Sequence, residues 1–447
     1  MWRGAFSPVT AGLKGLSHRQ TGLRHKAFVA ILLAATLVAP RVAWTQTVSQ
    51  RGSVEGRALL FPQDAPNDRT SSVVDVLVRE EAFVKLRPWL QLAGGVDLRA
   101  NSHDQIEDVW RLDFSDRIAP RPRMSIRRLS ATVAHGRFTA DVGKQFIRRG
   151  RTDILNPTDR FAPRDFLNVV DTEFLGVTGA RGVVQASDTD TVEVVWLPRF
   201  TPSRIPLLDQ RWTAVPTAAQ GIQIVDAGAT LPDGSQTGVR WNHVGAGFEY
   251  SFSFFDGFNH LPNIEVGLVG QVGQVGQGPP QGIGQIAVTR LYPAIRTYGA
   301  DAAVPTRWFT IKGESAYFTS SSPMTDEYVL YVLQLERQTG EWVFVGGYAD
   351  EVVTNRRSAL NFAPDRGTTK SIIGRGAYTI DPNRSLAVEA AVRQNGVGAY
   401  LKAEYSQARG QHWRATAAVA LIGGEPDDFL GQYRRNSHVS LALRYSY

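Results

Sequence analysis

Alternation of apolar and polar residues with a period of two runs through most of the chain after Gln46 and predicts β-strands. In residues 248–254, aromatic residues share one face, while a glutamate and two serines share the other. Residues 89–99, 385–393 and 399–406 alternate in the same way. With their flanks these runs last about 9–12 residues, the length that a tilted strand needs to cross a hydrocarbon layer. The pattern therefore favours strands that cross a membrane.

Very short turns alternate with long connections between these runs, and most of the turns contain the Gly, Pro, Asn, Asp or Ser that tight turns favour. Eight short turns are expected at 87–88, 135–136, 187–190, 245–247, 304–306, 338–340, 381–383 and 408–410. The long connections are expected at 101–123, 150–175, 201–237, 261–290, 353–368 and 424–436. Short turns at one end and long loops at the other are typical of outer-membrane barrels.

The eight turns join eight pairs of strands, and two further strands complete the count. One is the final segment 437–447, and the other is a short segment at 56–61 that precedes the first pair. We therefore expect an all-β fold, a single transmembrane antiparallel barrel of about 18 strands (16–18), spanning residues 46–447 as one domain. An even strand number places both ends of the barrel on the same side of the membrane.

Residues 1–45 have the features of a secretory signal peptide. Arg24, His25 and Lys26 precede an apolar stretch at 27–40, and small residues at 43 and 45 permit cleavage before Gln46. The alternative is a permanent anchor, but this stretch is shorter than the ~20 residues that span a bilayer as a helix. No other segment approaches a transmembrane helix, so a barrel is the remaining way for the chain to span a membrane.

Charge and cysteine content exclude several classes of function. The whole chain has a formal net charge of +7, but residues 1–45 hold six basic residues and no acidic ones. The remainder has 43 basic and 42 acidic residues, so a nucleic-acid partner loses its support. The chain has no cysteine, which excludes disulfides, thiolate metal sites, a cysteine nucleophile and a lipid-anchored N-terminal cysteine.

The last ten residues form an alternating strand that ends on an aromatic residue. Its apolar face comprises Val439, Leu441, Leu443, Tyr445 and Tyr447. This strand resembles the terminal signal of outer-membrane barrels, and the resemblance implies recognition by the barrel assembly machinery through strand addition. The alternative is an ordinary last strand of a soluble β-sandwich.

The polar faces of the strands carry charges of both signs, which in a barrel would line the lumen. The candidate pore-lining residues on strands are Asp97, Arg99, Lys312, Glu314, Glu389, Arg393, Lys402, Glu404, Arg414 and Arg444. Arginine-rich walls suit anionic or hydroxylated solutes, because the guanidinium group matches carboxylate and phosphate. The alternative is that most of these charges only keep the lumen hydrated.

The segment 143–165 has the most unusual composition. It holds five candidate constriction residues among three aspartates: Arg148, Arg149, Arg151, Arg160 and Arg164. A loop folded into the lumen as a constriction would use this chemistry, and an extracellular loop held together by ion pairs would use it equally.

The same segment carries a family resemblance. Gly143-Lys144-Gln145 at a strand end, Arg149-Gly150 and Asn156-Pro157 resemble the alginate-export-type outer-membrane porins and related barrels over residues 143–200. The resemblance implies a porin-like barrel. Lys144 stands where an arginine is expected in such proteins, and no polyuronate-binding set can be transferred, so the substrate stays open.

Catalytic constellations are not evident in the sequence. The six histidines after residue 45 are scattered, with no nearby serine and aspartate pattern and no H-E-x-x-H motif. We expect a porin-like channel for small polar or anionic solutes in the bacterial outer membrane, with no catalytic residue, cofactor or metal site. Its expected partners are outer-membrane lipid, the barrel assembly machinery and a small solute. The alternatives are a soluble β-rich binding protein and a barrel hydrolase.

Overall fold

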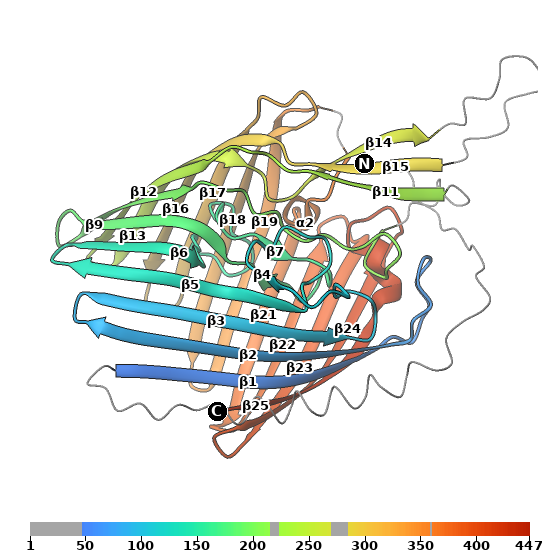
Figure 1. Ribbon diagram of the computed structural model, residues 1–447, viewed down its shortest axis with the longest axis horizontal. Coiled ribbons are helices and arrows are strands. Elements are labelled where there is room, and N and C mark those ends of the chain that lie inside the picture. The colour runs from blue at the N-terminus through green and yellow to red at the C-terminus, as the bar shows by residue number, and fades with distance from the viewer. Residues whose placement is uncertain (1–46, 215–222, 270–284, 358–359) are drawn as a thin grey trace, which may run out of the picture.

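Eighteen antiparallel strands close into one barrel in a computed structural model that describes residues 47–214, 223–269, 285–357 and 360–447. The predicted signal peptide at 1–45 lies outside the described residues. The strands follow one another around the barrel in chain order, and the ring closes where β25 pairs with β1 (Figure 1).

The barrel strands are β1 (Thr47–Leu60), β2 (Ser72–Arg87), β3 (Leu90–Asn101), β5 (Met124–His135), β6 (Phe138–Gln145), β9 (Val177–Gln185), β10 (Asp190–Leu197), β12 (Gln236–Gly245), β13 (Phe248–Phe258), β16 (Ala294–Pro305), β17 (Thr310–Thr319), β18 (Glu327–Thr339), β19 (Trp342–Asn355), β21 (Ser371–Asp381), β22 (Arg384–Arg393), β23 (Gly398–Arg409), β24 (Trp413–Gly424) and β25 (His438–Ser446). The connections contain β4 (Leu112–Asp113), β7 (Arg164–Asp165), β8 (Glu173–Phe174), β11 (Gln223–Thr230), β14 (Asn263–Val269), β15 (Gln285–Leu291), β20 (Leu360–Asn361), the helix α2 (Pro364–Gly367) and the 3₁₀ helix η2 (Gly431–Asn436). Among the described residues, no helix is long and apolar enough to span a membrane.

The predicted strand count and all eight short turns are confirmed. The first strand is longer than the predicted segment 56–61, because β1 pairs with β2 from Thr47 opposite Lys85 to Leu60 opposite Ser72. Its first half contains glutamine, arginine, glycine and serine, so apolar alternation does not reveal it. The pairing with β2 determines this half.

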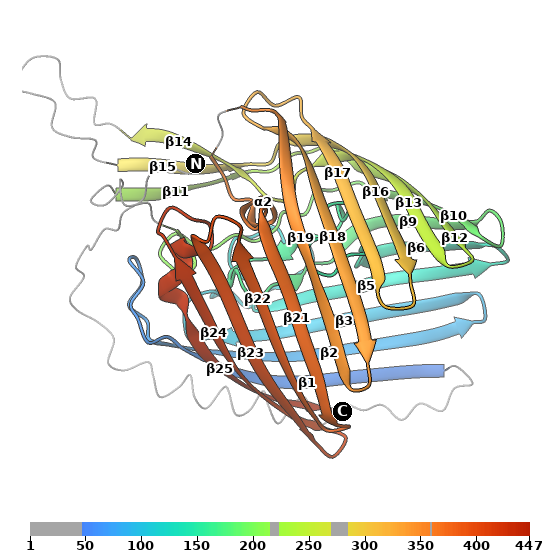
Figure 2. The same ribbon diagram turned by 180° about the vertical axis from the view of Figure 1, so that it is seen from behind.

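Apolar side chains point outward around the barrel. The register places Val439 opposite Val419, and Leu441 opposite both Ala417 and Ala58. Leu441 remains 51% exposed although it lies in the middle of a strand. An apolar outer surface and a charged interior are the inverse of a soluble β-protein and are what a lipid-embedded barrel presents. Figure 2 shows β17, β18, β19 and β21 to β25 following one another in the barrel wall.

Long connections fold over and into one end of the barrel, which we call the long-loop end. Four short strands there form a separate sheet in the order β11, β15, β14 and β20, which projects from this end (Figure 1). Inside the barrel, Ile147 and Phe161 from the connection after β6 pack on Leu197, Phe255 and Leu330 of the wall. This apolar contact places that connection against the inner face of the barrel.

Candidate channel constriction

The connection between β6 and β9 enters the lumen directly from the end of β6. Gly143 has φ +118°, and a Cβ there would collide with the carbonyl of Leu129. This backbone turn directs Lys144 inward, although its opposite residue, Leu129, points outward. Lys144 is fully buried, and its ammonium group donates to the carbonyl of Phe114 at 2.8 Å and to Asp116 at 2.5 Å. The unusual lysine therefore connects β6 to the loop that follows β3.

Residues 146–163, the constriction segment, lie inside the barrel along its inner wall and bind that wall through Glu314 of β17. The Glu314 carboxylate accepts backbone N–H groups of Arg151 at 2.9 Å, Thr152 at 3.2 Å and Thr158 at 2.9 Å. It also accepts the hydroxyls of Thr152 at 2.9 Å and Thr158 at 2.8 Å. Five donors on one buried carboxylate fix the position of this segment.

Further contacts spread the constriction segment over the wall from β10 to β18. Arg149 is buried and pairs with Glu193 at 2.7 Å. Arg151 pairs with Asp301 and Glu249. Asp153 accepts from Lys312 at 3.0 Å. The segment therefore lies inside the barrel, and most of its described ion pairs are made with the wall and not within the segment.

Three arginines of the connection remain near open space. Arg148 and Arg164 stack on the ring of Phe174, at 4.1 and 4.5 Å from its centroid. Arg160 lies over Phe318 and is 4.0 Å from Asp365. Arg160 and Arg164 line a cavity of about 310 Å³, the wide cavity. Within the described residues, no carboxylate lies at ion-pair distance from Arg148 or Arg164.

Asp159 lies beside these arginines and is buried. Its carboxylate accepts the backbone N–H of Arg149 at 3.0 Å. Burial raises the pKa of Asp159 to about 6, although this hydrogen bond and the charges of Arg160 and Arg164 oppose the shift. The charge in the wide cavity is therefore expected to change near pH 6.

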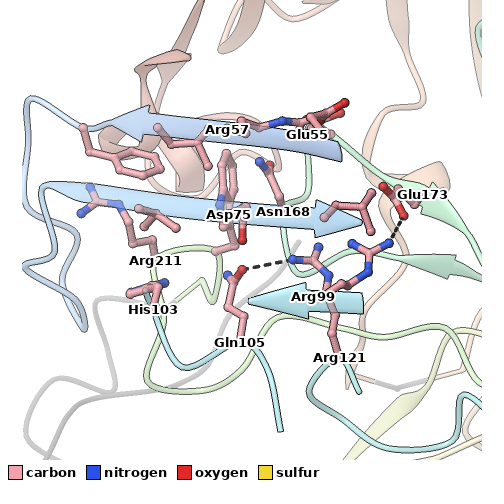
Figure 3. A pocket seen from close by; sticks show the side chains of 16 residues that line it. Glu55, Arg57, Asp75, Arg99, His103, Gln105, Arg121, Asn168, Glu173 and Arg211 are labelled. Carbon is pink, nitrogen blue, oxygen red and sulfur yellow. Dashed lines mark hydrogen bonds and ion pairs between the residues drawn. The ribbon is translucent and has the colours of Figure 1, made fainter. Parts of the chain in front are cut away.

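The wall of β1, β2 and β3 lines a second, smaller cavity of about 70 Å³, the narrow cavity (Figure 3). Here Arg79 pairs with Asp97 at 2.7 Å, and Arg99 pairs with Asp97 at 3.1 Å and with Glu173 at 2.6 Å. Arg121 in turn binds Asp165 through two hydrogen bonds. Each of these three arginines therefore has a carboxylate partner.

One short stretch of chain separates the two cavities. Asn168 and Asp171 line the narrow cavity, whereas Val170 and Thr172 line the wide cavity. The stretch 166–173 therefore forms a partition inside the barrel, and its two sides differ in polarity.

The other predicted lining residues lie on the inward face of β22 to β25, and the structure does not gather them into one site. Glu389 lines the wide cavity. Lys402 pairs with Glu404 at 3.2 Å, and Arg414 lies opposite Arg444 in the register. Arg393 instead donates to Asp428 at 3.0 Å, in the loop before η2.

The sequence analysis missed Arg211, which joins three long connections at the long-loop end. Its guanidinium donates to the carbonyls of Gln63, Thr70 at 2.6 Å and Arg435 at 3.1 Å, and it stacks on Phe61 at 4.1 Å. Its backbone partners leave no sequence pattern, so only its burial in the folded chain identifies it.

Replacing Arg211 by alanine is expected to loosen these connections by about 2–4 kcal/mol, because three carbonyls in partly buried hydrogen bonds lose their donor. Hydrogen exchange of residues 61–71 and 431–436 should accelerate while the barrel strands stay protected. Arg434→Ala is the matched control, since the described acceptor of the Arg434 side chain is Gly431 within its own turn, at 3.3 Å. Equal exchange in both variants would contradict the joining role.

No family model matches the chain, and no curated protein matches it. Solved structures of low identity do match. OccAB4 of Acinetobacter baumannii is 11% identical, with a TM-score of 0.52 and coverage of 90% of this chain and 98% of that one. A BenF-like porin from Pseudomonas fluorescens is 8% identical, with a TM-score of 0.53 and coverage of 90% and 98%. The outer-membrane protein opdK of Pseudomonas aeruginosa is 9% identical, with a TM-score of 0.51 and coverage of 89% and 98%. The chain therefore has the fold of the outer-membrane porins.

Proposed function

We propose that the chain is a porin-like channel of the bacterial outer membrane that passes small polar or anionic solutes. The short turns face the periplasm, the long connections face outward, and the apolar belt contacts outer-membrane lipid. The constriction segment narrows the lumen, and solutes pass it through the wide cavity.

The arginine pair stacked on Phe174 is the observation that carries this proposal. Arg149 and Arg151 are already bound to wall carboxylates, so they have little capacity for a solute. Arg148 and Arg164 have an aromatic ring as their described partner, which leaves their N–H groups available for a carboxylate. Cavities of roughly 300 Å³ and more are of the size that binds small organic molecules.

One structural neighbour supports a small anionic solute. The opdK protein of Pseudomonas aeruginosa has been solved with vanillate, at 10% identity and a TM-score of 0.50. Vanillate is an aromatic carboxylate, and the wide cavity is lined by Arg160 and Arg164 as well as by Tyr400 and Tyr433. The resemblance of residues 143–200 to alginate-export-type porins implies only a porin-like barrel and does not favour a particular solute.

Conductance measurements test the channel and its selectivity. The purified full chain in planar bilayers should show stepwise conductance, and a salt gradient should reveal anion preference. Changing Arg148 and Arg164 together to glutamine should reduce that preference and weaken competition by benzoate, while neutral benzyl alcohol should have little effect on either protein. Lys402→Gln is the control in the lumen. An unchanged selectivity would place the passage elsewhere, and absence of any conductance would refute the channel.

The pH dependence of selectivity follows from Asp159. Its raised pKa means that lowering the pH from 7.5 to 5 neutralises one carboxylate beside Arg160 and Arg164, so anion preference should rise. Because the folded state binds this proton more tightly than the unfolded state, the same change should also stabilise the protein, and this stability is lost as the pH rises through about 6.

Asp159→Asn should remove both trends. Asp153→Asn is the control, because hydrogen bonds from Gln334 and Lys312 overcome burial and lower the pKa of Asp153. Reversal potentials recorded at several pH values, together with thermal unfolding in detergent, provide the two measurements. A pH response that persists in Asp159→Asn would assign it to another group.

A further inference from the structure

The outer rim at the short-turn end carries an exposed patch of aromatic rings and arginines. The rim patch comprises Arg307, Trp308, Phe309, Arg337, Trp342 and Phe344. The turn between β16 and β17 presents its first three residues, and Arg337 of β18 lies opposite Phe344 of β19 in the register. Trp308 is 57% exposed and Phe309 is 42% exposed, so the patch is open to the surroundings of the barrel.

Hydrogen bonds hold the turn that presents this patch. The backbone N–H of Thr306 donates to the carbonyl of Phe309 at 2.8 Å, and the Thr306 hydroxyl donates to the same carbonyl at 2.6 Å. The hydroxyl also accepts the N–H of Phe309 at 3.1 Å. The two arginines then flank one indole ring, with Arg307 at 5.1 Å and Arg337 at 5.6 Å from the ring of Trp308.

In the part of the chain that the structure describes, neither arginine of the rim patch forms an ion pair. Other arginines on the same rim do, since Arg384 pairs with Asp381 at 2.6 Å and Arg137 lies 3.7 Å from Asp188. Among the described residues, no carboxylate is within ion-pair distance of Arg307 or Arg337. Two positive charges beside exposed rings are therefore left for a ligand outside the chain.

We propose that the rim patch binds the headgroup of an anionic phospholipid in the membrane leaflet around the short turns. This inference rests on the proposed membrane location of the barrel. Indole rings settle at the level of lipid headgroups, and guanidinium groups pair with phosphate oxygens through parallel hydrogen bonds. A phosphatidylglycerol headgroup has a net negative charge that two arginines can neutralise, whereas the phosphate of phosphatidylcholine already has its own cation.

Fluorescence quenching by brominated lipid tests this site in the full chain. The protein is reconstituted in phosphatidylcholine vesicles that contain a minor fraction of brominated phosphatidylglycerol, or the same fraction of brominated phosphatidylcholine. The difference between the parent protein and Trp308→Phe isolates the signal of Trp308. Its quenching should indicate about a fivefold local preference for phosphatidylglycerol, the size expected for a basic residue at an anionic membrane surface.

Variants separate the headgroup site from general insertion. Changing Arg307 and Arg337 together to glutamine should abolish the preference, while Arg384→Gln on another turn should retain it. Equal quenching of Trp308 by both lipids in the parent protein would overturn the headgroup site. Loss of the preference on adding inorganic phosphate would assign the site to a free anion instead. Absence of quenching of any tryptophan by either lipid would refute membrane insertion, and with it the proposed function.

Discussion

Replacing Glu314 by alanine is expected to release the constriction segment and to raise single-channel conductance at least about twofold. The substitution leaves three backbone N–H groups and the Thr158 hydroxyl without their acceptor, while the Thr152 hydroxyl keeps the carbonyl of Leu155. Leaving a buried hydrogen-bond donor without its acceptor costs about 1–3 kcal/mol. Much of that cost falls on the segment, because the strands on either side of Glu314 keep their own hydrogen bonds.

Glu404→Ala provides the matched control. Glu404 is also an inward glutamate, but its described ion pair is with Lys402 on the same strand, at 3.2 Å. The control should leave conductance close to that of the parent protein. Limited proteolysis adds a second measurement, since residues 150–160 should become cleavable in Glu314→Ala while the barrel still migrates as a folded species without heating. Unchanged conductance with a cleaved segment would show that the segment does not limit the passage.

The strands of this fold could be predicted because their signals are local. Successive side chains on a strand face lipid and lumen in turn, and each tight turn favours residues such as Gly, Pro, Asn, Asp or Ser. The first half of β1 lacks that signal because Gln50 and Gly52 occupy outward positions beside Glu80 of β2. The polar residues at these outward positions are explained by their contacts with β2 in the folded barrel.

The partners of the constriction segment, in contrast, could not be predicted from the sequence. Its charges are visible in the sequence, but its partners Asp301 and Glu314 lie about 150 residues away and are brought near by barrel closure. Adjacent residues also differ, since Arg149 is buried against Glu193 while Arg148 is exposed. A segment without regular structure has no periodicity that could separate two neighbouring arginines. Composition therefore identified the region, and only the folded barrel distinguishes structural arginines from available ones.

Tyr447 lies where the barrel closes, at the end of β25. Its backbone exchanges two hydrogen bonds with Gly52 of β1, at 2.9 and 3.0 Å. Its hydroxyl donates to Glu80 at 2.9 Å, and Gln50 donates to the same carboxylate at 2.7 Å. A Cβ on residue 52 would meet the ring of Tyr447, so glycine is needed for the ring to lie over β1. Tyr447 thus connects the end of β25 with β1 and β2 at the seam of the barrel.

Deleting Tyr447 is expected to reduce strongly the fraction of chain that reaches the folded, heat-modifiable form. The deletion removes two backbone hydrogen bonds, worth about 1–3 kcal/mol together, and the phenol bond to an outward carboxylate in the same step. It also shortens the apolar strand that we propose is recognised during assembly by strand addition. Folding in detergent and assembly in cells should both be measured, because the first reports the seam alone.

Point substitutions separate the two contributions of this residue. Tyr447→Phe keeps the backbone pairing and loses only the bond to Glu80, so it should retain most of the folded fraction. Gly52→Ala displaces the ring without shortening β25, and it should resemble Tyr447→Phe more than the deletion. If the deletion folds normally in detergent yet fails in cells, the residue acts in recognition and contributes little to closure. Normal folding and normal assembly of the deletion would contradict both roles, and the closing pair of strands would then depend on the eight pairings from Ser53 to Leu60.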